Sequence, residues 1–431
     1  MKSVIPFTGR LVCLYILMVI SGGCLKDKVT NTYTFQRPVY ETLTQARAVI
    51  KAGAASPIAA PGKICLYKNY IFLNEGSKGI HVIDNTNPAL PRNISFINIP
   101  GNMDISIKDD ILYADEAYGD LVALDIRDPE HAVVKKFIPQ VFANYYDSGI
   151  ILNPDSLQVI TGWVTRDTTV TVPQGGSPLV YNYPGVLCSS CSYFAVAAPN
   201  SATGVTPTGT TATNGSTSAF AISNNDLYAL SYGGRINVVD ISTAADPAIV
   251  NQVSLTDYTQ TIFPFENKLF LGAYNGMSIY DISDPSTPVK EGSFSHVRTC
   301  DPVITDGQHA FVTLRSGTAC AGYTNELDVL DISNLTNPVL IKVYALTSPR
   351  GLAKDGDLLF ICDGPAGLKV YHAADVNQLT LIDTNSGFEA NDVIAGNGLA
   401  IVLAADGLYQ CDYSDTSHIH QISKIDVHAA L

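Results

Sequence analysis

Three features of the sequence predict an all-β fold. A short apolar strand that closes on a polar residue, usually aspartate, recurs seven times at a spacing of about 40 residues. A second apolar strand precedes each copy, and most of these strands follow a hairpin-type dipeptide. Weaker alternating strands flank each pair. Four antiparallel strands per repeat make one β-propeller blade. The sequence therefore predicts a β-propeller, most simply of seven four-stranded blades with one long insertion between blades 2 and 3; six or eight blades are the alternatives if the insertion contributes strands.

The repeated strands follow one another in a constant order. The closing strands are 79–84, 120–125, 235–240, 276–281, 326–331, 367–372 and 407–412. The strands before them are 70–74, 111–115, 227–230, 269–273, 310–314, 358–362 and 399–403. Polar dipeptides such as Asn224-Asn225 and Asn397-Gly398 precede most of these strands. Because Asn and Gly tolerate positive φ, these dipeptides predict tight hairpin turns.

The repeated aspartate is usually followed by small polar residues and then proline, as in Asp84 to Pro88, Asp125 to Pro129 and Asp281 to Pro285. Aspartates on loops are also calcium ligands, which is one interpretation. Each copy, however, supplies only one or two carboxylates and lacks the dense spacing of a calcium loop. We therefore predict turns in which the carboxylate accepts backbone N–H groups and proline ends the strand.

These repeats resemble those of the LVIVD-repeat proteins of bacteria and archaea, most plainly at 277–285 and 327–338. The segment from Pro61 to Ile64, followed by 79–88, is similar to the lipoprotein branch common in Bacteroidetes. The resemblance covers residues 61–141 and 217–427. In the last two copies the proline turn is missing, and in one of them His372 replaces the aspartate.

The resemblance implies a propeller on a secreted or cell-surface protein. The family has no established enzymatic activity, so it implies no catalytic residues and no cofactor. The sequence itself contains no nucleophile elbow, zinc-protease or phosphate-loop motif.

The N-terminus predicts export and lipidation. Lys2 and Arg10 precede an apolar run at 11–20, which is too short to span a bilayer and is typical of a signal peptide. The small residues before Cys24 resemble a lipobox, although Ser21 stands where leucine is usual. We expect a signal peptide at 1–23, diacylation of Cys24, and an outer-membrane lipoprotein that is exposed at the cell surface or faces the periplasm.

The remaining chain is expected to form one domain. Residues 24–60 are predicted to be a tether with a short helix within 40–52, and residues 61–431 the propeller. We also expect the C-terminal strand at 419–427 to complete the blade that begins near residue 64. Sharing one blade between both ends would close the ring and remove exposed strand edges.

The insertion at 142–216 has two parts. Its first part predicts strands, arranged as an extended hairpin, and contains the only tryptophan, Trp163. Residues 199–218 are nearly all Ser, Thr, Gly, Ala, Asn and Pro, which predicts a mobile loop. Aromatic residues on a displayed loop could bind sugar rings or anchor a protein partner, or could simply pack the insertion onto the blades. These candidates are Tyr145, Tyr146, Trp163, Tyr181 and Tyr183.

An exported protein can keep cysteines paired in disulfides. Cys300 and Cys320 flank a strand of the fifth repeat and are predicted to form a disulfide across the loop at 315–326. Cys188 and Cys191 predict a second disulfide; half of a zinc site is the alternative, but no second ligand pair accompanies it. Three further cysteines fall inside strands and are expected to be buried thiols: Cys65, Cys362 and Cys411.

Charge and composition narrow the function. The net charge of −14 argues against nucleic acid and anionic membranes as electrostatic partners. Asp301 and Arg315 are the candidate polar groups of the central channel. We expect a monomeric, non-enzymatic module that binds protein or glycan, with no metal. The alternatives are a periplasm-facing assembly scaffold, and a hydrolase or lyase with its site at the channel mouth.

Overall fold

The computed structural model describes residues 28–142, 158–173, 211–231, 234–296, 302–317 and 323–428. The chain divides into two compact units. One unit contains residues 47–149 and 190–431, and the other contains residues 1–46 and 150–189. Each unit is described by itself below.

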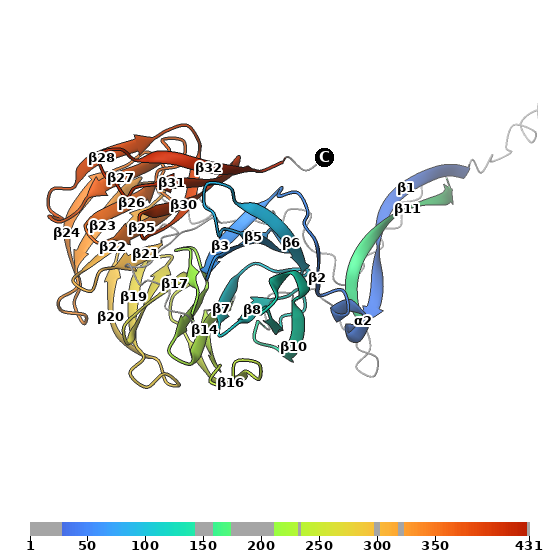
Figure 1. Ribbon diagram of the computed structural model, residues 1–431. Helices are drawn as coiled ribbons and strands as arrows, with labels where there is room; N and C mark the ends of the chain where they lie inside the picture. Colours follow the sequence, from blue (N-terminus) through green and yellow to red (C-terminus); the bar gives the residue numbers. More distant parts are fainter. Residues whose placement is uncertain are drawn as a thin grey trace, which may run out of the picture. The chain divides into compact units, whose positions relative to one another are not determined.

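The larger unit is a seven-bladed β-propeller, as predicted (Figure 1). Blade 1 contains β3 (Pro61–Tyr67), β4 (Tyr70–Glu75), β5 (Gly79–Asp84) and β6 (Arg92–Asn98). Blade 2 contains β7 (Ile105–Lys108), β8 (Ile111–Asp115), β9 (Leu121–Asp125) and β10 (Val133–Ile138). Blade 3 contains β13 (Phe220–Ser223), β14 (Asp226–Ser231), β15 (Arg235–Asp240) and β16 (Ala248–Ser254). Blades 4 and 5 are formed by β17 (Thr259–Phe265), β18 (Lys268–Ala273), β19 (Gly276–Asp281), β20 (Val289–Ser295); and β21 (Val303–Thr305), β22 (His309–Leu314), β23 (Glu326–Asp331), β24 (Val339–Ala345). Blades 6 and 7 are formed by β25 (Leu352–Asp355), β26 (Leu358–Cys362), β27 (Leu368–His372), β28 (Thr380–Asn385); and β29 (Ala390–Gly396), β30 (Leu399–Ala404), β31 (Gly407–Asp412), β32 (His420–Asp426).

The antiparallel order gives the propeller two distinct faces. In each blade the first of the four strands lies nearest the axis among them and pairs with the second, the second with the third and the third with the fourth. We call the face where the innermost strands begin the loop face. The opposite face, which holds the first hairpin of each blade and the turn after the repeated aspartate, is the turn face. Residues in these hairpins adopt positive φ, such as 54° at both Asn224 and Asn397, as the dipeptides predict.

Glycine opens several of the closing strands because the neighbouring outer strand leaves no room for a side chain. Gly79 and Gly276 have φ values of +149° and +150°. A Cβ at either position would lie 2.1 Å from a carbonyl oxygen of the outer strand, that of Ile97 or Phe294. Close backbone approach therefore explains part of the sequence repeat.

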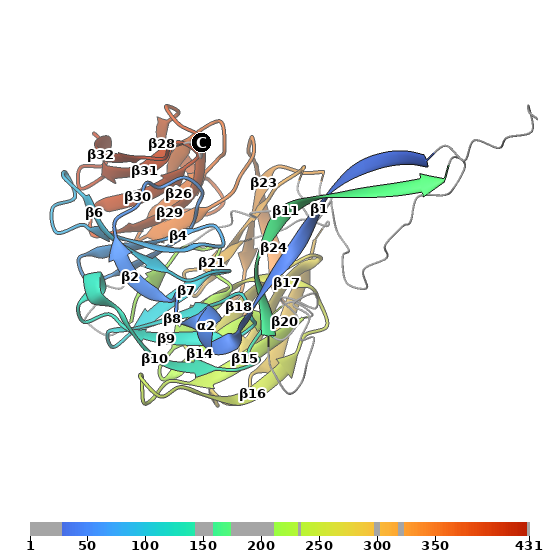
Figure 2. The same ribbon diagram turned by 90° about the vertical axis from the view of Figure 1, so that its right-hand side faces the viewer.

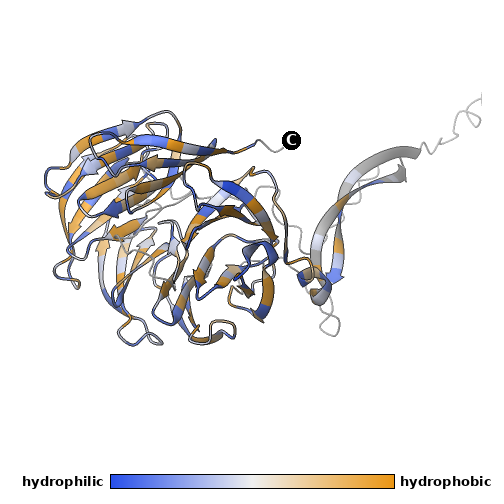
Figure 3. Cartoon of the chain, in the orientation of Figure 1, coloured by the Kyte–Doolittle hydropathy of each residue, from blue (hydrophilic) through white to orange (hydrophobic). Residues whose placement is uncertain are grey.

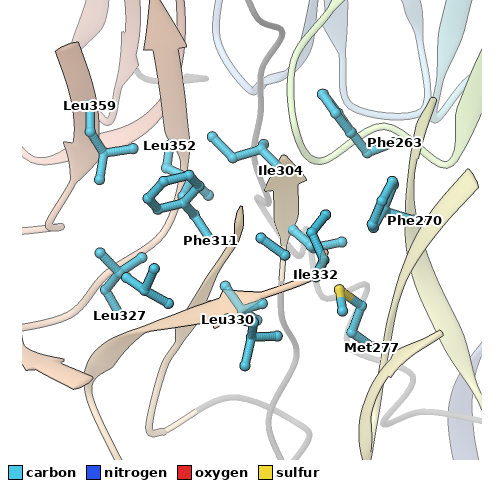
Figure 4. Close-up of a cluster of buried hydrophobic side chains, with 14 of the residues drawn as sticks. Phe263, Phe270, Met277, Ile304, Phe311, Leu327, Leu330, Ile332, Leu352 and Leu359 are labelled. Carbon is cyan, nitrogen blue, oxygen red and sulfur yellow. The ribbon is translucent and has the colours of Figure 1, made fainter. Parts of the chain in front are cut away.

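Apolar side chains between neighbouring blades form the core. Figure 3 shows apolar residues running along the blade strands. In the largest cluster, Phe270 and Met277 of blade 4 pack with Phe311 of blade 5 and Leu352 of blade 6, all at most 1% exposed (Figure 4). Burying side chains of this size stabilises the folded state by about 1.5–3 kcal/mol each. The repeat is therefore held together mainly by contacts between blades.

The ring closes differently from our prediction. The C-terminal strand β32 pairs with β31 within its own blade, and blade 1 takes none of its strands from the C-terminus. Blades 7 and 1 nevertheless lie side by side (Figure 2). Asn85 and Gln410 exchange two amide hydrogen bonds, of 3.0 and 2.7 Å, and Ser423 Oγ donates to the carbonyl of Pro88. Side-chain packing and this amide pair close the ring without strand exchange.

The smaller unit contains a two-stranded ribbon that the sequence did not predict. β1 (Lys28–Thr42) pairs antiparallel with β11 (Gln158–Pro173), with a register shift at Val39 and Tyr40. β11, the strand of the insertion in this unit, therefore pairs with the N-terminal segment. The predicted helix shrinks to α2 (Leu43–Arg47), because residues to Thr42 are taken up by β1. In the larger unit, β2 (Lys51–Ala54) extends blade 1 along the outer side of β6.

Two short helical segments are described, α2 and the 3-10 turn η1 (Pro129–His131). They have five and three residues. Within the described part of the chain, no helix is long enough to cross a bilayer.

Candidate functional site

The centre of the propeller is occupied by residues 211–219, which we call the axial segment. Its strand β12 (Thr213–Asn214) pairs with the inner side of β3, and Thr211 bridges Lys108 of β7. The backbone N–H of Gly215 donates to Ile64 of blade 1, and Ile262 of blade 4 donates to the carbonyl of Ser218. Only a segment on the axis reaches the innermost strands of blades 1, 2 and 4 together.

Charged side chains from three adjacent blades hold the axial segment on the loop-face side. Asp104 of blade 2 accepts hydrogen bonds from Ser218 Oγ, at 3.1 Å to both carboxylate oxygens, and from the N–H of Ala219. Asp392 of blade 7 accepts from Thr217 Oγ1 at 3.3 Å. Lys63 of blade 1 donates to the carbonyl of Thr217. The three charged side chains thus fix three consecutive residues of the segment, Thr217 to Ala219.

These axial groups titrate abnormally because they are removed from water. Burial raises the pKa of Asp104 and raises that of Asp392 to about 8. Burial lowers the pKa of Lys63, although the carboxylates of Asp104 and Asp392 oppose that shift. Removal from water disfavours the charged form of each group, and opposite charges nearby compensate in part.

The axial segment overlaps residues that the sequence predicted to be mobile. Composition assigned 199–218 to a mobile loop, but Ser216, Thr217 and Ser218 are at most 6% exposed and residues 213–214 form a strand. The prediction was therefore wrong for residues 211–218. The axial segment has no core of its own that could satisfy its hydroxyl and backbone N–H groups. Carboxylates distant in the sequence accept hydrogen bonds from these groups instead. The remainder, 199–210, lies outside the described residues.

A second buried carboxylate lies beside this cluster in blade 2. Asp115 Oδ1 accepts from Asn102 Nδ2 at 2.9 Å and from the N–H groups of Met103 and Asp104 at 2.7 and 2.9 Å. Burial raises the pKa of Asp115 to about 7 despite these donors. Its hydrogen bonds fix the chain just before β7, which places Asp104 at the axis.

The two faces of the propeller differ in how their connections vary. On the turn face, the connection after the repeated aspartate has the same seven-residue length in every blade: 85–91, 126–132, 241–247, 282–288, 332–338, 373–379 and 413–419. On the loop face, connections range from the two residues 274–275 to the insertion that follows β10. Variable loops on a rigid scaffold are where binding residues concentrate.

Hydrogen bonds explain the uniform turns. The repeated aspartate accepts the N–H of the residue two positions on, for example Asp281 from Ser283 at 2.9 Å. In blade 7, which lacks the proline, Asp412 accepts from Ser414 at 2.8 Å and Asp415 from Ser417 at 2.9 Å. The predicted turn role is confirmed, and it survives the loss of proline. Within the described ranges, no group of three or more His, Cys, Asp or Glu is arranged to hold a metal.

The loop face also gathers aromatic and cationic side chains. Tyr258 and Tyr323 are 45% and 92% exposed in connections of blades 4 and 5. Arg350, just before β25, donates to Glu389 and Asn391 of blade 7. Arg315 follows β22 and is partly buried. Burial and the positive charge of Arg350 lower the pKa of Arg315.

Of the predicted ligand-binding residues, the structure describes two. Arg315 lies on the loop face of the propeller, and Trp163 lies in β11 of the smaller unit, opposite Pro38. The others lie outside the described residues, as do the lipidation and disulfide candidates: Cys24, Tyr145, Tyr146, Tyr181, Tyr183, Cys188, Cys191, Cys300, Asp301 and Cys320. The three strand cysteines Cys65, Cys362 and Cys411 are buried free thiols, as predicted.

Comparison with known families agrees with the repeat. The LVIVD-repeat profile matches residues 265–295 and 317–345, which contain the closing and outer strands of blades 4 and 5. The chain therefore carries LVIVD repeats within a β-propeller fold. No curated protein sequence matches it.

The chain is similar to several solved structures. The computationally designed Ika8 protein has a TM-score of 0.51 and 12% identity, over 88% of this chain and 90% of that chain. A protein from Lactobacillus plantarum has a TM-score of 0.49 and 14% identity, over 86% and 97% of the two chains. BamB from Moraxella catarrhalis has a TM-score of 0.44 and 10% identity, over 90% and 92%. At such low identity a likeness shows the fold alone.

The axial cluster was missed because each blade contributes one member. Lys63, Asp104 and Asp392 each stand immediately before the apolar run of an innermost strand, at the same position of the LVIVD-repeat blade. Aligning the seven repeats on that position would have placed a lysine between two aspartates in three consecutive blades around the ring. The sequence signal was present, but it lay outside the closing strand that defines the repeat.

Proposed function

We propose that this protein is a lipid-anchored binding module of the cell envelope that holds a protein or glycan ligand on the loop face of its propeller and catalyses no reaction. The observation that carries the proposal is the contrast between the faces. Every turn-face connection after the repeated aspartate has one length, whereas the loop face carries the insertion and the irregular loops. Exposed Tyr258 and Tyr323 and the arginines Arg315 and Arg350 add side chains that are frequent at binding hot spots.

The bonding of the axial carboxylates favours binding over catalysis. Asp104 and Asp115 accept backbone N–H groups that fix the axial segment and the chain before β7. A general acid or base must direct its proton or lone pair at a substrate. Carboxylates committed to the protein's own backbone suit a structural role, so a hydrolase or lyase at the axis is the less favoured alternative.

The proposed location follows from the N-terminal sequence. The apolar run at 11–20 and the small residues before Cys24 support export and a lipid anchor at that cysteine. An anchored propeller on the cell surface would present its loops to external ligands. If it instead faced the periplasm, assembly of envelope complexes would become the better proposal.

Protease treatment of intact cells that carry the full-length chain tests the location. Digestion in intact cells is expected, and a parallel permeabilised sample shows that the protein is cleavable in both cases. Protection until the cells are permeabilised would contradict surface exposure and favour the periplasmic scaffold.

Binding is tested by presenting the purified protein to a glycan array and to envelope and extracellular proteins. Tyr323→Ala on the loop face should weaken capture, whereas Leu90→Ala on the turn face, at 71% exposure, should not. Loss of glycan capture by Trp163→Ala in a folded protein would assign a glycan and the insertion as its site. Equal capture by all variants, or no capture by the wild type, would contradict the proposal.

A further inference from the structure

Two arginines from neighbouring blades lie on the loop face, close enough for the charge of Arg350 to lower the pKa of Arg315. Arg315 directly follows β22 of blade 5, and Arg350 precedes β25 of blade 6. Thr313 Oγ1, two residues before Arg315, donates to the carbonyl of Arg350 at 2.7 Å. The N–H of Arg350 donates in turn to the carbonyl of Cys362 at 2.7 Å. Both arginines therefore extend from fixed strand ends.

The loop that begins at Arg315 is fixed at its base as well. Asn325 Oδ1 accepts the N–H of Ser316 at 3.0 Å, and Asn325 Nδ2 donates to Ser316 Oγ at 2.8 Å. The carbonyl of Asn325 accepts the N–H of Leu346 at 2.9 Å. These bonds tie both ends of the loop to blade 5, so the position of Arg315 does not depend on the middle of the loop.

The two guanidinium groups differ in their partners. Arg350 donates through both terminal nitrogens, to the carboxylate of Glu389 and to the amide oxygen of Asn391. Arg315 donates no hydrogen bond to any side chain or carbonyl within the described chain, although it is partly buried. A guanidinium is charged at every physiological pH and carries five N–H donors. Among the described residues no acceptor takes up these donors, although the side chain is partly buried.

We propose that Arg315, together with Arg350, binds a side-chain carboxylate from an acidic segment of a protein partner. This inference rests on the proposed function and specifies the chemistry of its ligand. The planar fork of arginine matches a carboxylate with two parallel hydrogen bonds. Glu389 already presents a carboxylate to Arg350 and accepts one hydrogen bond from a terminal nitrogen of its guanidinium.

The surroundings of the pair favour a protein partner. Tyr323, 92% exposed, lies in the loop that Arg315 begins, and clustered Tyr and Arg are enriched where protein interfaces carry most of their binding energy. The chain as a whole has a net charge of −14, so an acidic segment is not attracted by the bulk charge. Attraction must come from the local pair, which makes it selective for that position.

Replacing Glu389 distinguishes carboxylate binding by the two arginines from a purely structural role of these residues. Its side chain is 42% exposed and competes for Arg350 with any incoming carboxylate. Glu389→Gln removes the competing charge and should strengthen binding of an acidic peptide. Arg315→Gln should weaken the same binding, and Arg315→Lys, which keeps the charge but not the fork, should fall between wild type and Arg315→Gln.

The experiment measures fluorescence anisotropy of a labelled hexaglutamate peptide titrated with the full chain. Arg235→Gln is the matched control, because Arg235 is an exposed arginine at the loop-face end of blade 3. Circular dichroism melts establish that each variant is folded. Arg315→Gln is expected to weaken binding on the order of tenfold or more, as for loss of one member of a desolvated charge pair. Arg235→Gln should leave it unchanged, and Glu389→Gln should tighten it.

Three results would overturn the inference. One is equal affinity of wild type and Arg315→Gln for hexaglutamate. Another is tighter Arg315-dependent binding of oligogalacturonate, which would assign an acidic sugar. The third is absence of hexaglutamate binding by a wild type that still captures its partner through Tyr323; in that case the proposed function stands and only the ligand chemistry is wrong. Failure of the proposed function would look different: no captured ligand would depend on any loop-face residue.

Discussion

Replacing Asp115 with alanine should lower the free energy of unfolding of the propeller by about 3 kcal/mol or more, since three donors lose their acceptor and each unpaired donor costs at least about 1 kcal/mol. The donors are the side chain of Asn102 and the N–H groups of Met103 and Asp104, at 2.7 to 2.9 Å from Asp115 Oδ1. Asp115 is 1% exposed, so water cannot replace the carboxylate without rearrangement. The loss should therefore be close to the full cost of three unpaired groups.

Asp115→Asn is the matched variant, because its amide oxygen can still accept from all three donors. It should stay within about 1 kcal/mol of wild type at neutral pH, since one neutral hydrogen bond more or less has that size. Urea unfolding followed by circular dichroism measures both variants. Tryptophan fluorescence is unsuitable, because Trp163 lies in the smaller unit. An alanine variant as stable as the asparagine variant would refute the capping role of Asp115.

Further predictions concern pH, the axial segment and ring closure. Burial raises the pKa of Asp115 to about 7 and that of Asp392 to about 8, so the folded state binds protons that the unfolded state has released above about pH 4. The free energy of unfolding should thus fall as pH rises from 5 to 8, by at most about 1.4 kcal/mol per pH unit for each group. Asp115→Asn should reduce this dependence on pH. Unfolding midpoints that rise over this range would contradict the prediction. Gly215→Ala should destabilise the propeller by about 1–3 kcal/mol, because a Cβ would lie 2.4 Å from the Asp392 carboxylate. Gly396→Ala, which has open space around it, should be nearly neutral. Thermal melts measure both variants. Gln410→Ala removes both amide bonds between blades 7 and 1 and should cost about 2 kcal/mol; unchanged hydrogen exchange at that junction would show that the pair does not close the ring.

The blades could be predicted from the sequence because their contacts are local and repeated. Each closing strand pairs with strands a few residues away, and short hairpins such as Asn224-Asn225 fix the register. The turn role of the repeated aspartates was also predictable, since Asp281 bonds to the N–H only two residues on. Repetition and short range made both features visible without knowledge of distant contacts.

The remaining features depend on contacts that link distant residues. β1 and β11 pair across more than one hundred residues, as in Thr34 with Asp167, and nothing in either strand specifies the other. The axial segment looks mobile by composition, and only its contacts with Asp104 and Asp392 explain why it is ordered. Of the candidate site, sequence identified Arg315 but not Arg350, because the partner comes from the next blade.

Arg315 and Arg350 also show why a binding surface is hard to predict from one chain. Neither belongs to the repeat, and each stands in a connection whose length differs from blade to blade. Loop-face residues are free to vary because the innermost and second strands carry the packing. The same freedom that allows a ligand site to arise there removes the periodic signal that would identify it.

Photocrosslinking tests the central claim most directly, that ligands bind the loop face. A photoreactive phenylalanine analogue placed at Tyr323 on the loop face is compared with the same analogue at Leu90 on the turn face, both strongly exposed. Cells that carry each variant are irradiated, and the covalent adducts are isolated and identified. A specific adduct is expected from position 323 and none from position 90. An adduct from position 90 alone would contradict binding at the loop face and place the binding surface on the uniform turns.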